Sequence, residues 1–339
     1  MITVINEKID QNSDEKGGNV EVMESKEIFL QKNKISNKFY ELEKIDPDLW
    51  DVLKEIYEDY ELKLQNGSLR KTVTNFIEEI GTPSAMHSMR YRIKSPESLI
   101  VKIIHKKFSD FTDTDYANIT KDTYGKVIMD LLGARILIRH RYQWEEIHDL
   151  IWHLYSKGTD RYVKNRLKDY VGNSEEAFLA ERPKVFYRYE ESTKCYELKG
   201  RDIFDFEKNN TGYSSNHYII NYFGTYIELQ VRTLFDEAWS ESDHDFVYKL
   251  YAGNKKLVLK RTSNLLSKVA EVADELSMFM HDYYDESIYS VPEEKVEVKK
   301  NLTEKLERIQ TMIPENRKFD NLHSRSVTSK SVGDINDLY

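Results

Sequence analysis

The sequence of 339 residues is poor in cysteine, proline and glycine, with 1, 6 and 13 of them. The single thiol, Cys195, excludes an internal disulfide and a zinc site built from several cysteines. Because no run of roughly 18 apolar residues occurs, we expect no membrane-spanning helix. Residues 1–19 also lack the apolar core of a secretory signal, so the expected compartment is the cytoplasm.

Positive charge is in deficit as well. The chain has 50 lysines and arginines against 59 aspartates and glutamates, a formal net charge of −9. This balance disfavours broad, nonspecific binding to nucleic acid, although local basic clusters can coexist with an acidic total. Hydrophobic residues make up 40% of the chain and charged residues 32%, which is typical of a globular protein that can bury a substantial core.

Composition and periodicity divide the chain into four parts. We expect a flexible polar segment over residues 1–40, a main domain over 41–285, a helical appendage over 286–315 and a disordered tail over 316–339. Residues 172–211 read as an irregular, charged insertion in the main domain. A hairpin of 185–189 against 196–206 fits the pattern inside it.

Apolar spacing predicts the elements of the main domain. The expected helices are 49–60, 69–80, 95–104, 144–155, 234–250 and 255–284, and the expected strands are 86–94, 134–139, 216–223 and 226–232. Ser95 and Pro96 form a good helix start, with a serine cap and a proline at the first helical position. Gly224 and Thr225 form the turn of a hairpin between the last two strands.

The last of these strands carries an unusual polar face. Ile227, Leu229 and Val231 alternate with Glu228, Gln230 and Arg232. Since a strand repeats every two residues, a carboxylate, an amide and a guanidinium share one face. An ordinary solvated face would favour threonine or lysine, so this pattern indicates recognition of metal, phosphate or a base.

A cationic strip is predicted where an earlier strand enters a helix. Arg92 and Lys94 project from one strand face just before the helix that begins after Ser95. The free amides of a helix N-terminus suit phosphate oxygens. Ser98 and Lys102 are four residues apart and extend the strip along one helix face. The simpler reading is a solvated basic strand edge.

Asp130 precedes a buried strand and is flanked by apolar residues. A carboxylate there is costly unless it is paired or bound to metal. Taken alone, it could equally cap a turn or pair with Arg135. Together with Glu228 it predicts a two-carboxylate Mg²⁺ site, since Mg²⁺ favours one or two carboxylates plus substrate phosphates.

Tyr213 lies in a loop that leads into a strand, where an exposed ring could stack on a nucleobase or simply pack beneath the loop. His217 could contact phosphate or ribose, or have a structural role. His244 and Asp245 form a pair like that of metal-dependent phosphohydrolases, but we interpret it as structural because no partner histidine lies nearby.

Five motifs in this order resemble the synthetase domain of RelA/SpoT-homologue enzymes, especially the single-domain small alarmone synthetases. They are Arg92-Ile93-Lys94-Ser95-Pro96-Glu97-Ser98, Asp130-Leu131-Leu132-Gly133-Ala134-Arg135, Lys168-Asp169-Tyr170, Gly212-Tyr213-Ser214-Ser215-Asn216-His217 and Glu228-Leu229-Gln230-Val231-Arg232-Thr233. The resemblance covers about residues 45–285. It implies an α+β, nucleotidyltransferase-like fold: a mixed β-sheet flanked by helices, here with helical extensions at both ends.

The resemblance also implies a reaction. In this family the β,γ-pyrophosphate of ATP is transferred to the 3′-hydroxyl of GDP or GTP, which gives AMP and the alarmone (p)ppGpp. The implied ATP-binding residues are Arg92 and Arg135, which would sandwich the adenine, and Lys94, Ser98 and Lys102 on the phosphate side.

The remaining roles follow from the same resemblance. Asp130 and Glu228 would bind Mg²⁺, and Glu228 or Gln230 would orient or deprotonate the attacking hydroxyl. The implied acceptor-side residues are Tyr213, which would stack on the base, and His217, Lys168 and Arg232.

One departure leaves the acceptor open. About forty residues separate Tyr170 from Tyr213, more than in the compact members, so the acceptor-side phosphate ligands (Lys168 and Lys184 are candidates) are not fixed by the pattern. Some relatives modify the 3′ CCA end of tRNA or adenosine nucleotides instead. A non-catalytic nucleotide-binding module is the third reading. A homo-oligomer or an antitoxin-type partner is also compatible with the sequence.

Overall fold

The computed structural model describes residues 23–110, 113–157, 176–188, 193–196, 201–248 and 254–289, with a few isolated residues beyond. Its contacts divide the chain into two units, Met1–Ala270 and Glu271–Tyr339, and each is considered by itself. The expected tail over 316–339 and the motif at Lys168 lie outside the described residues, as does most of the expected appendage over 286–315.

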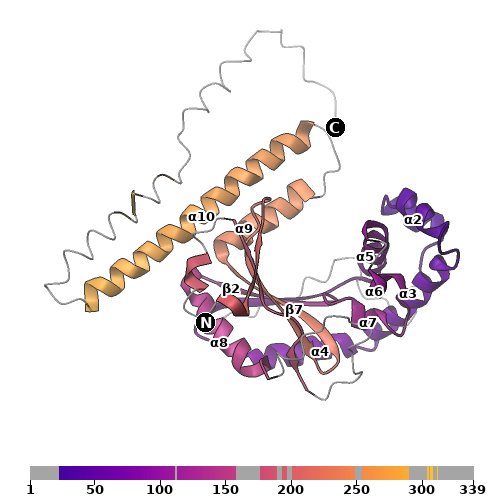
Figure 1. Cartoon of the computed structure of the whole chain (residues 1–339), viewed down its shortest axis with the longest axis horizontal. Coiled ribbons are helices and arrows are strands. Elements are labelled where there is room, and N and C mark those ends of the chain that lie inside the picture. The colour runs from indigo at the N-terminus through magenta and orange to yellow at the C-terminus, as the bar shows by residue number, and fades with distance from the viewer. Residues whose placement is uncertain are drawn as a thin grey trace, which may run out of the picture. The chain divides into compact units, whose positions relative to one another are not determined.

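A mixed β-sheet forms the centre of the first unit (Figure 1). In the described residues it has seven strands: β1 (Met86–Ile93), β2 (Leu132–Ile138), β3 (Phe178–Leu179), β4 (Lys184–Tyr187), β5 (Asp205–Lys208), β6 (Ser215–Tyr222) and β7 (Thr225–Thr233). The order is β1-β2-β7-β6-β4-β5, and β3 pairs with β6. The pairs β2–β7 and β4–β5 are parallel and the others antiparallel, which confirms the expected α+β class.

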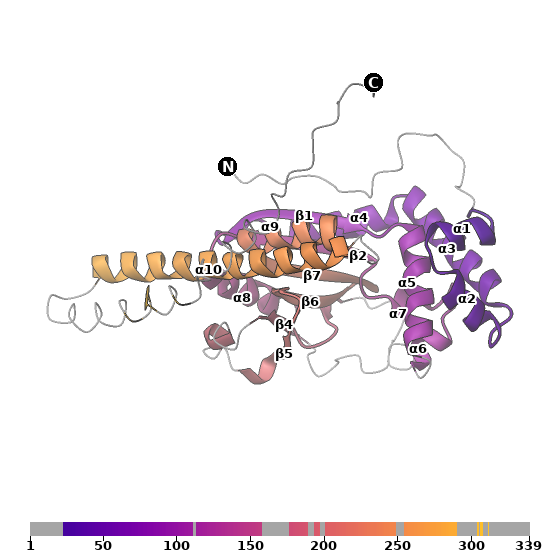
Figure 2. The same ribbon diagram turned by 90° about the horizontal axis from the view of Figure 1, so that it is seen from above.

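The helices of the first unit are α1 (Lys26–Lys32), α2 (Ser36–Glu43), α3 (Leu49–Gln65), α4 (Ser68–Ile80), α5 (Pro96–Ser109), α6 (Thr114–Ala117), α7 (Tyr124–Val127), α8 (Trp144–Tyr155) and α9 (Leu234–Asp243). Helix α10 (Asn254–Tyr289) begins in the first unit and continues into the second. Short 3-10 turns occur at Arg141–Gln143 and Arg201–Ile203. In Figure 1, α4 and α8 lie below the strands and α9 above them, while Figure 2 shows α1, α2, α3 and α5 grouped beyond the sheet.

Local sequence signals account for most of these boundaries. The Ser95 hydroxyl accepts a hydrogen bond from the backbone N–H of Ser98, so it caps α5 as predicted. The predicted β6–β7 hairpin forms, but its turn is Phe223-Gly224, one residue earlier than predicted, and both turn residues have positive φ. That geometry matches the right-handed twist of the two strands. Helix α8 has the predicted bounds.

The expected flexible segment over residues 1–40 is wrong for its described part. Residues 26–43 form α1 and α2, and Phe29, Leu30, Ile35 and Phe39 are almost fully buried in the main core. The four apolar side chains are too sparse among polar residues to give a clear helical period. Burial in the tertiary structure therefore stabilises two helices that the local sequence pattern does not predict.

The expected hairpin inside residues 172–211 is also wrong. The strands β4 and β5 are adjacent but parallel, and β4 pairs on its other side with β6 in antiparallel orientation. The described part of the supposed insertion thus extends the central sheet. Whether two strands are parallel or antiparallel depends on the path of the chain that connects them. The alternation of apolar and polar residues does not predict that path.

The helix expected over 234–250 is interrupted. Helix α9 ends at Asp243, and residues His244–Tyr248 form one π-helical turn. His244 and Asp245 are both exposed, with 3.7 Å between His244 Nδ1 and Asp245 Oδ1. Within the part of the chain that the structure describes, no helix combines the length and apolarity needed to cross a membrane.

The burial of α1 can be tested with two neighbouring residues. Leu30 is fully buried whereas Ile28 is 57% exposed. We expect Leu30→Ala to lower the free energy of unfolding by about 2–5 kcal/mol, because it leaves a cavity in the core. Ile28→Ala should cost less than about 0.5 kcal/mol. Urea unfolding of both variants measures the difference, and equal costs would contradict a folded α1.

A buried tyrosine predicts a loss of stability at alkaline pH. The Tyr124 hydroxyl is buried and donates a hydrogen bond to Asp59 at 2.7 Å. Burial and the Asp59 carboxylate together raise the pKa of Tyr124. A pKa raised on folding gives stability that is complete below the unfolded value, about 10, and is lost as pH rises above it.

We therefore expect the free energy of unfolding of the wild type to fall more steeply above pH 10 than that of Tyr124→Phe, by about 1.4 kcal/mol per pH unit. Tyr40→Phe is the control for loss of a tyrosine hydroxyl, because Tyr40 is 42% exposed. Urea unfolding at several alkaline pH values measures the slopes, and parallel curves for wild type and Tyr124→Phe would refute this assignment.

Candidate functional site

Polar side chains of five neighbouring strands meet on one face of the sheet. Gln230 of β7 lies opposite Arg135 of β2 on one side and His217 of β6 on the other. The same row continues to Arg90 of β1 and to Lys184 of β4. The strand register, not the sequence spacing, thus aligns four basic side chains with one amide.

The next row of this face holds a carboxylate beside a gap. Glu228 of β7 lies opposite Gly133 of β2, which lies opposite Arg92 of β1. A Cβ on Gly133 would come no closer than 3.9 Å to the neighbouring backbones. The glycine therefore leaves the floor between Arg92 and Glu228 without a side chain.

Glu228 is the end point of a hydrogen-bond network. Its carboxylate lies 3.3 Å from His217 Nδ1 and accepts a hydrogen bond from Gln230 Nε2 at 3.0 Å. His217 Nε2 lies 2.7 Å from the Tyr213 hydroxyl, which accepts a hydrogen bond from Arg232 Nη2 at 3.0 Å. Arg232 also donates to the side-chain oxygen of Gln230. The network is closed on itself.

One set of proton positions satisfies all these atoms. Arg232 donates to the Tyr213 oxygen, and the Tyr213 hydroxyl donates to His217 Nε2. His217 then donates from Nδ1 to Glu228. Because a guanidinium is only a donor, Arg232 fixes the direction of the two bonds that it makes, to Tyr213 and to Gln230.

The network keeps Glu228 ionised. Burial alone would raise the pKa of Glu228, but the hydrogen bonds that it accepts from His217 and Gln230, with the nearby charge of Lys102, lower it to about 2. A carboxylate with so low a pKa is a weak base near neutral pH and a good cation ligand. Gln230 has an amide and cannot accept the proton of a hydroxyl, so of its two predicted roles only orientation is chemically available.

Asp130 lies between two lysines. Its carboxylate is 3.1 Å from Lys94 Nζ and 2.7 Å from Lys102 Nζ. Burial would raise the pKa of Asp130, but the two ammonium groups lower it. The pKa of Lys94 is lowered, mainly by burial and also by the charges of Lys102 and Arg92, against the pull of Asp130. Lys102 also lowers the pKa of Glu228, so it lies close enough to influence both carboxylates.

The other predicted ATP-side residues differ in accessibility. Arg92 is exposed, and no ion pair joins it to a residue that the structure describes. The Ser98 hydroxyl accepts a hydrogen bond from Ser95 at 2.8 Å, so it is part of the α5 cap. Arg135 is held by acids: its Nη1 donates to both oxygens of Glu237, at 2.7 and 3.0 Å, and to Glu241 at 3.0 Å.

On the acceptor side, the structure confirms that Tyr213 and His217 lie together and corrects the expectation for Arg232. Arg232 is 3% exposed, so its side chain supports Tyr213 instead of facing an acceptor. Its guanidinium carbon lies 5.1 Å from the centre of the Tyr213 ring. A base could therefore stack only on the opposite ring face. Lys168 lies outside the described residues.

Sequence reasoning missed two acids and one aromatic residue of this face. Glu237 and Glu241 lie one helical turn apart on α9, directly after the strand that ends in the polar face. That spacing is the signal that could have found them. Phe186 of β4 packs edge-on against Tyr213 and His217, at ring-centroid distances of 5.6 and 4.7 Å. Its contact depends on the β4–β6 pairing and leaves no signal in local sequence.

The donor chemistry fits a divalent cation. Asp130 and Glu228 are both ionised, and Mg²⁺ is commonly held by two carboxylates together with substrate phosphates. Within the described ranges, no group of three or more histidine, cysteine, aspartate or glutamate side chains is placed to hold a metal alone. Such a site would thus need a substrate to complete it.

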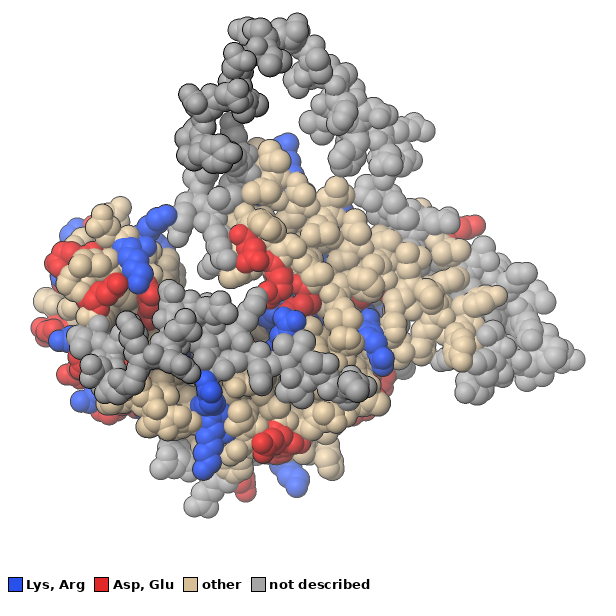
Figure 3. All heavy atoms as spheres, turned by 180° about the vertical axis from the view of Figure 1, so that it is seen from behind, with Lys and Arg blue, Asp and Glu red and all other residues tan. Residues whose placement is uncertain are grey.

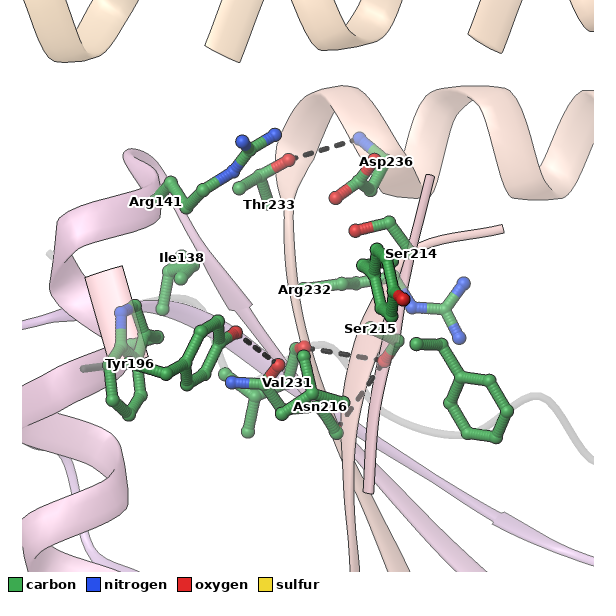
Figure 4. Close-up of a pocket in the computed structure, with 14 residues that line it drawn as sticks. Ile138, Arg141, Tyr196, Ser214, Ser215, Asn216, Val231, Arg232, Thr233 and Asp236 are labelled. Atoms are coloured by element: carbon green, nitrogen blue, oxygen red, sulfur yellow. Dashed lines mark hydrogen bonds between the residues drawn. The ribbon is translucent and has the colours of Figure 1, made fainter. Parts of the chain in front are cut away.

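A small pocket lies beside this face, at the ends of β2 and β7 (Figure 4). The Tyr196 hydroxyl donates to Asn216 Oδ1 at 2.5 Å, and the Asp236 backbone N–H donates to the Thr233 hydroxyl at 3.1 Å. Because these lining groups are bonded to one another, we assign no ligand to the pocket. On the face drawn in Figure 3, basic and acidic side chains are interspersed, as the acidic composition leads one to expect.

The fold and the site define a class: an α+β protein whose mixed sheet carries Glu228 and a row of basic side chains on one face, with Asp130 just before β2. Residues 91–253 match the family model described as a region found in RelA / SpoT proteins. The chain therefore contains a RelA/SpoT-type region, which confirms the resemblance seen in its motifs. No curated protein matches the chain.

Several solved structures are similar at low identity. The smu.1046c protein of Streptococcus mutans UA159 has 20% identity and a TM-score of 0.39, over 72% of this chain and 97% of its own. Small alarmone synthetase 1 of Bacillus subtilis has 17% identity and a TM-score of 0.38, over 70% of this chain and 99% of its own. A GTP pyrophosphokinase family protein of Streptococcus pneumoniae has 16% identity and a TM-score of 0.38, over 72% of this chain and 98% of its own. These pairwise likenesses are too low to assign a role to any residue.

The Tyr213 hydroxyl is predicted to hold the network together. We expect Tyr213→Phe to lower the free energy of unfolding by about 1–3 kcal/mol, because it leaves buried Arg232 and His217 each short of a partner. Tyr283→Phe is a matched control, since Tyr283 is 58% exposed. Urea unfolding measures both variants. An unchanged free energy of unfolding in Tyr213→Phe would show that the hydroxyl does not stabilise the network.

Proposed function

We propose that this protein transfers the β,γ-pyrophosphate of ATP to the 3′-hydroxyl of GDP or GTP. The hydroxyl oxygen attacks the β-phosphorus, the bond from that phosphorus to the α–β bridging oxygen breaks, and AMP leaves. The hydroxyl proton passes to solvent. One observation carries the proposal: inside the RelA/SpoT-type region, Lys102 is paired with Asp130 at 2.7 Å and also lowers the pKa of Glu228, so two ionised carboxylates lie near one cation.

The ATP side of this site is rich in cations. Lys94 and Lys102 are placed to move from Asp130 to phosphate oxygens when a nucleotide binds, since both are already held near the carboxylate that would share the metal. Arg92 and Arg135 lie on the same face, one row apart, with Gly133 leaving room next to them. Guanidinium planes stack well on a base, so this pair would hold the adenine.

The acceptor side is built around Tyr213. Its open ring face would stack on the acceptor base, and the row from His217 to Lys184 would face the acceptor phosphates. Glu228 would accept a hydrogen bond from the attacking hydroxyl. Since its carboxylate is ionised and only weakly basic, its part is to orient the hydroxyl and to bind the cation.

Asp130 and Glu228 would hold Mg²⁺ together with the ATP phosphates. When bound, the ion would neutralise charge on the phosphate oxygens. The residues themselves contribute position and fixed charge, which supply most of the catalysis in phosphoryl-type transfer.

The function is tested by release of AMP from ATP·Mg²⁺ mixed separately with GDP, GTP, ADP or deacylated tRNA. We expect release with GDP or GTP, and we expect Glu228→Gln to lower the rate by at least roughly a hundredfold, because the variant loses the carboxylate charge. Glu78→Gln on α4 is the control, since Glu78 is exposed and lies outside the strands that carry the site.

Separating a labelled product as nucleotide or as tRNA identifies the acceptor. Release that depends on tRNA or ADP alone would overturn the choice of guanosine nucleotide while keeping the transferase. Absence of AMP from every mixture would overturn the transferase itself.

A further inference from the structure

Glu237 is a buried carboxylate to which arginines from three strands converge. Its side chain is 8% exposed. It bonds to Arg135 of β2, and lies 3.8 Å from Arg90 Nη1 of β1 and 3.5 Å from Arg232 Nη1 of β7. Three guanidinium groups on one sheet face repel one another, so a single buried acid between them has a strong effect on where each lies.

On the donor side, Glu237 fixes the plane of one guanidinium. Both of its oxygens accept from Arg135 Nη1, with Glu241 as a third acceptor. Carboxylates bind a guanidinium at its edge, in its own plane. The flat faces of Arg135 therefore stay available for stacking, and its side chain remains 27% exposed.

On the acceptor side, the same carboxylate acts through Arg232. That guanidinium lies against Glu237 with one nitrogen and donates with another to the Tyr213 hydroxyl. The chain of bonds continues from Tyr213 through His217 to Glu228. Glu241 contacts Arg135, and it is 37% exposed on the α9 surface.

We propose that Glu237 is a positioning residue for both nucleotide subsites, setting the plane of Arg135 for the donor base and holding Arg232 and Tyr213 for the acceptor base. This rests on the proposed function of the face. Glu241, by contrast, contacts the donor-side Arg135. Neither acid contacts a reacting atom, so both act through the arginines that they bind.

The two acids make different predictions for steady-state kinetics. In Glu237→Gln we expect the KM for ATP and the KM for the acceptor to rise together, each roughly tenfold, because the charged hydrogen bonds to Arg135 and the ion pair with Arg232 are both weakened. In Glu241→Gln only the KM for ATP should rise. Glu237→Asp, which keeps the charge, should recover part of both losses.

The split between KM and kcat separates positioning from a purely structural role. A variant that is partly unfolded has fewer active molecules, which lowers the apparent kcat and leaves KM unchanged. Should Glu237→Gln fail to fold, the KM for ATP and the KM for the acceptor can be compared in Glu237→Asp and Glu241→Gln instead. Unchanged KM values in folded Glu237 variants, or a rise in only one of the two, would overturn the proposal.

Failure of the proposed function has a different appearance. In that case the wild type releases no AMP with any acceptor. Calorimetric binding of ATP and of GDP to wild type and Glu237→Gln would then test Glu237 without catalysis. Weaker binding of both nucleotides by the variant supports the positioning role, and equal binding rejects it.

Discussion

The arrangement of the site depends on one constraint: a guanidinium can donate hydrogen bonds but cannot accept them. Arg232 is buried and donates to Tyr213 and to the side-chain oxygen of Gln230, so the Gln230 amide is left to donate its N–H to Glu228. Glu237 and Glu228 are the two acids at the ends of this chain of bonds. Between them they supply the negative charge that allows a buried arginine on a sheet face. The same network thus holds both the Glu228 carboxylate and the Tyr213 ring in place.

Charge on this face is balanced locally. Asp130 is paired with Lys94 and Lys102, and Glu237 is paired with the arginines of three strands. Each acid keeps cations close together that would otherwise repel. A polyphosphate with its metal ion carries both signs of charge. Its phosphates could therefore pair with the lysines and arginines, and its metal ion with the carboxylates, so that no buried charge loses its partner. This is why a strongly cationic face is compatible with an acidic protein.

Local patterns predicted much of the fold. Alternation in 227–232 located β7 and its polar face, and the Ser95-Pro96 pair located the start of α5. They failed where structure depends on distant contacts. Helices α1 and α2 are stabilised by burial of a few apolar side chains, and the parallel pairing of β4 with β5 depends on the path of the chain between them. Neither property has a short-range period, so neither could be read from a window of sequence.

The sequence by itself determined which chemical groups are present and which faces they share: Glu228 with Gln230 and Arg232, and Arg92 with Lys94. It determined too that the region resembles RelA/SpoT proteins, because those motifs are local. Only the tertiary structure decided which groups meet. Arg232 became a buried support, Arg135 became tied to Glu237 and Glu241, and Asp130 came to lie between two lysines. The physical reason is that strand register and helix packing set distances between residues far apart in the chain, and the energy of a charge pair depends on that distance and on burial.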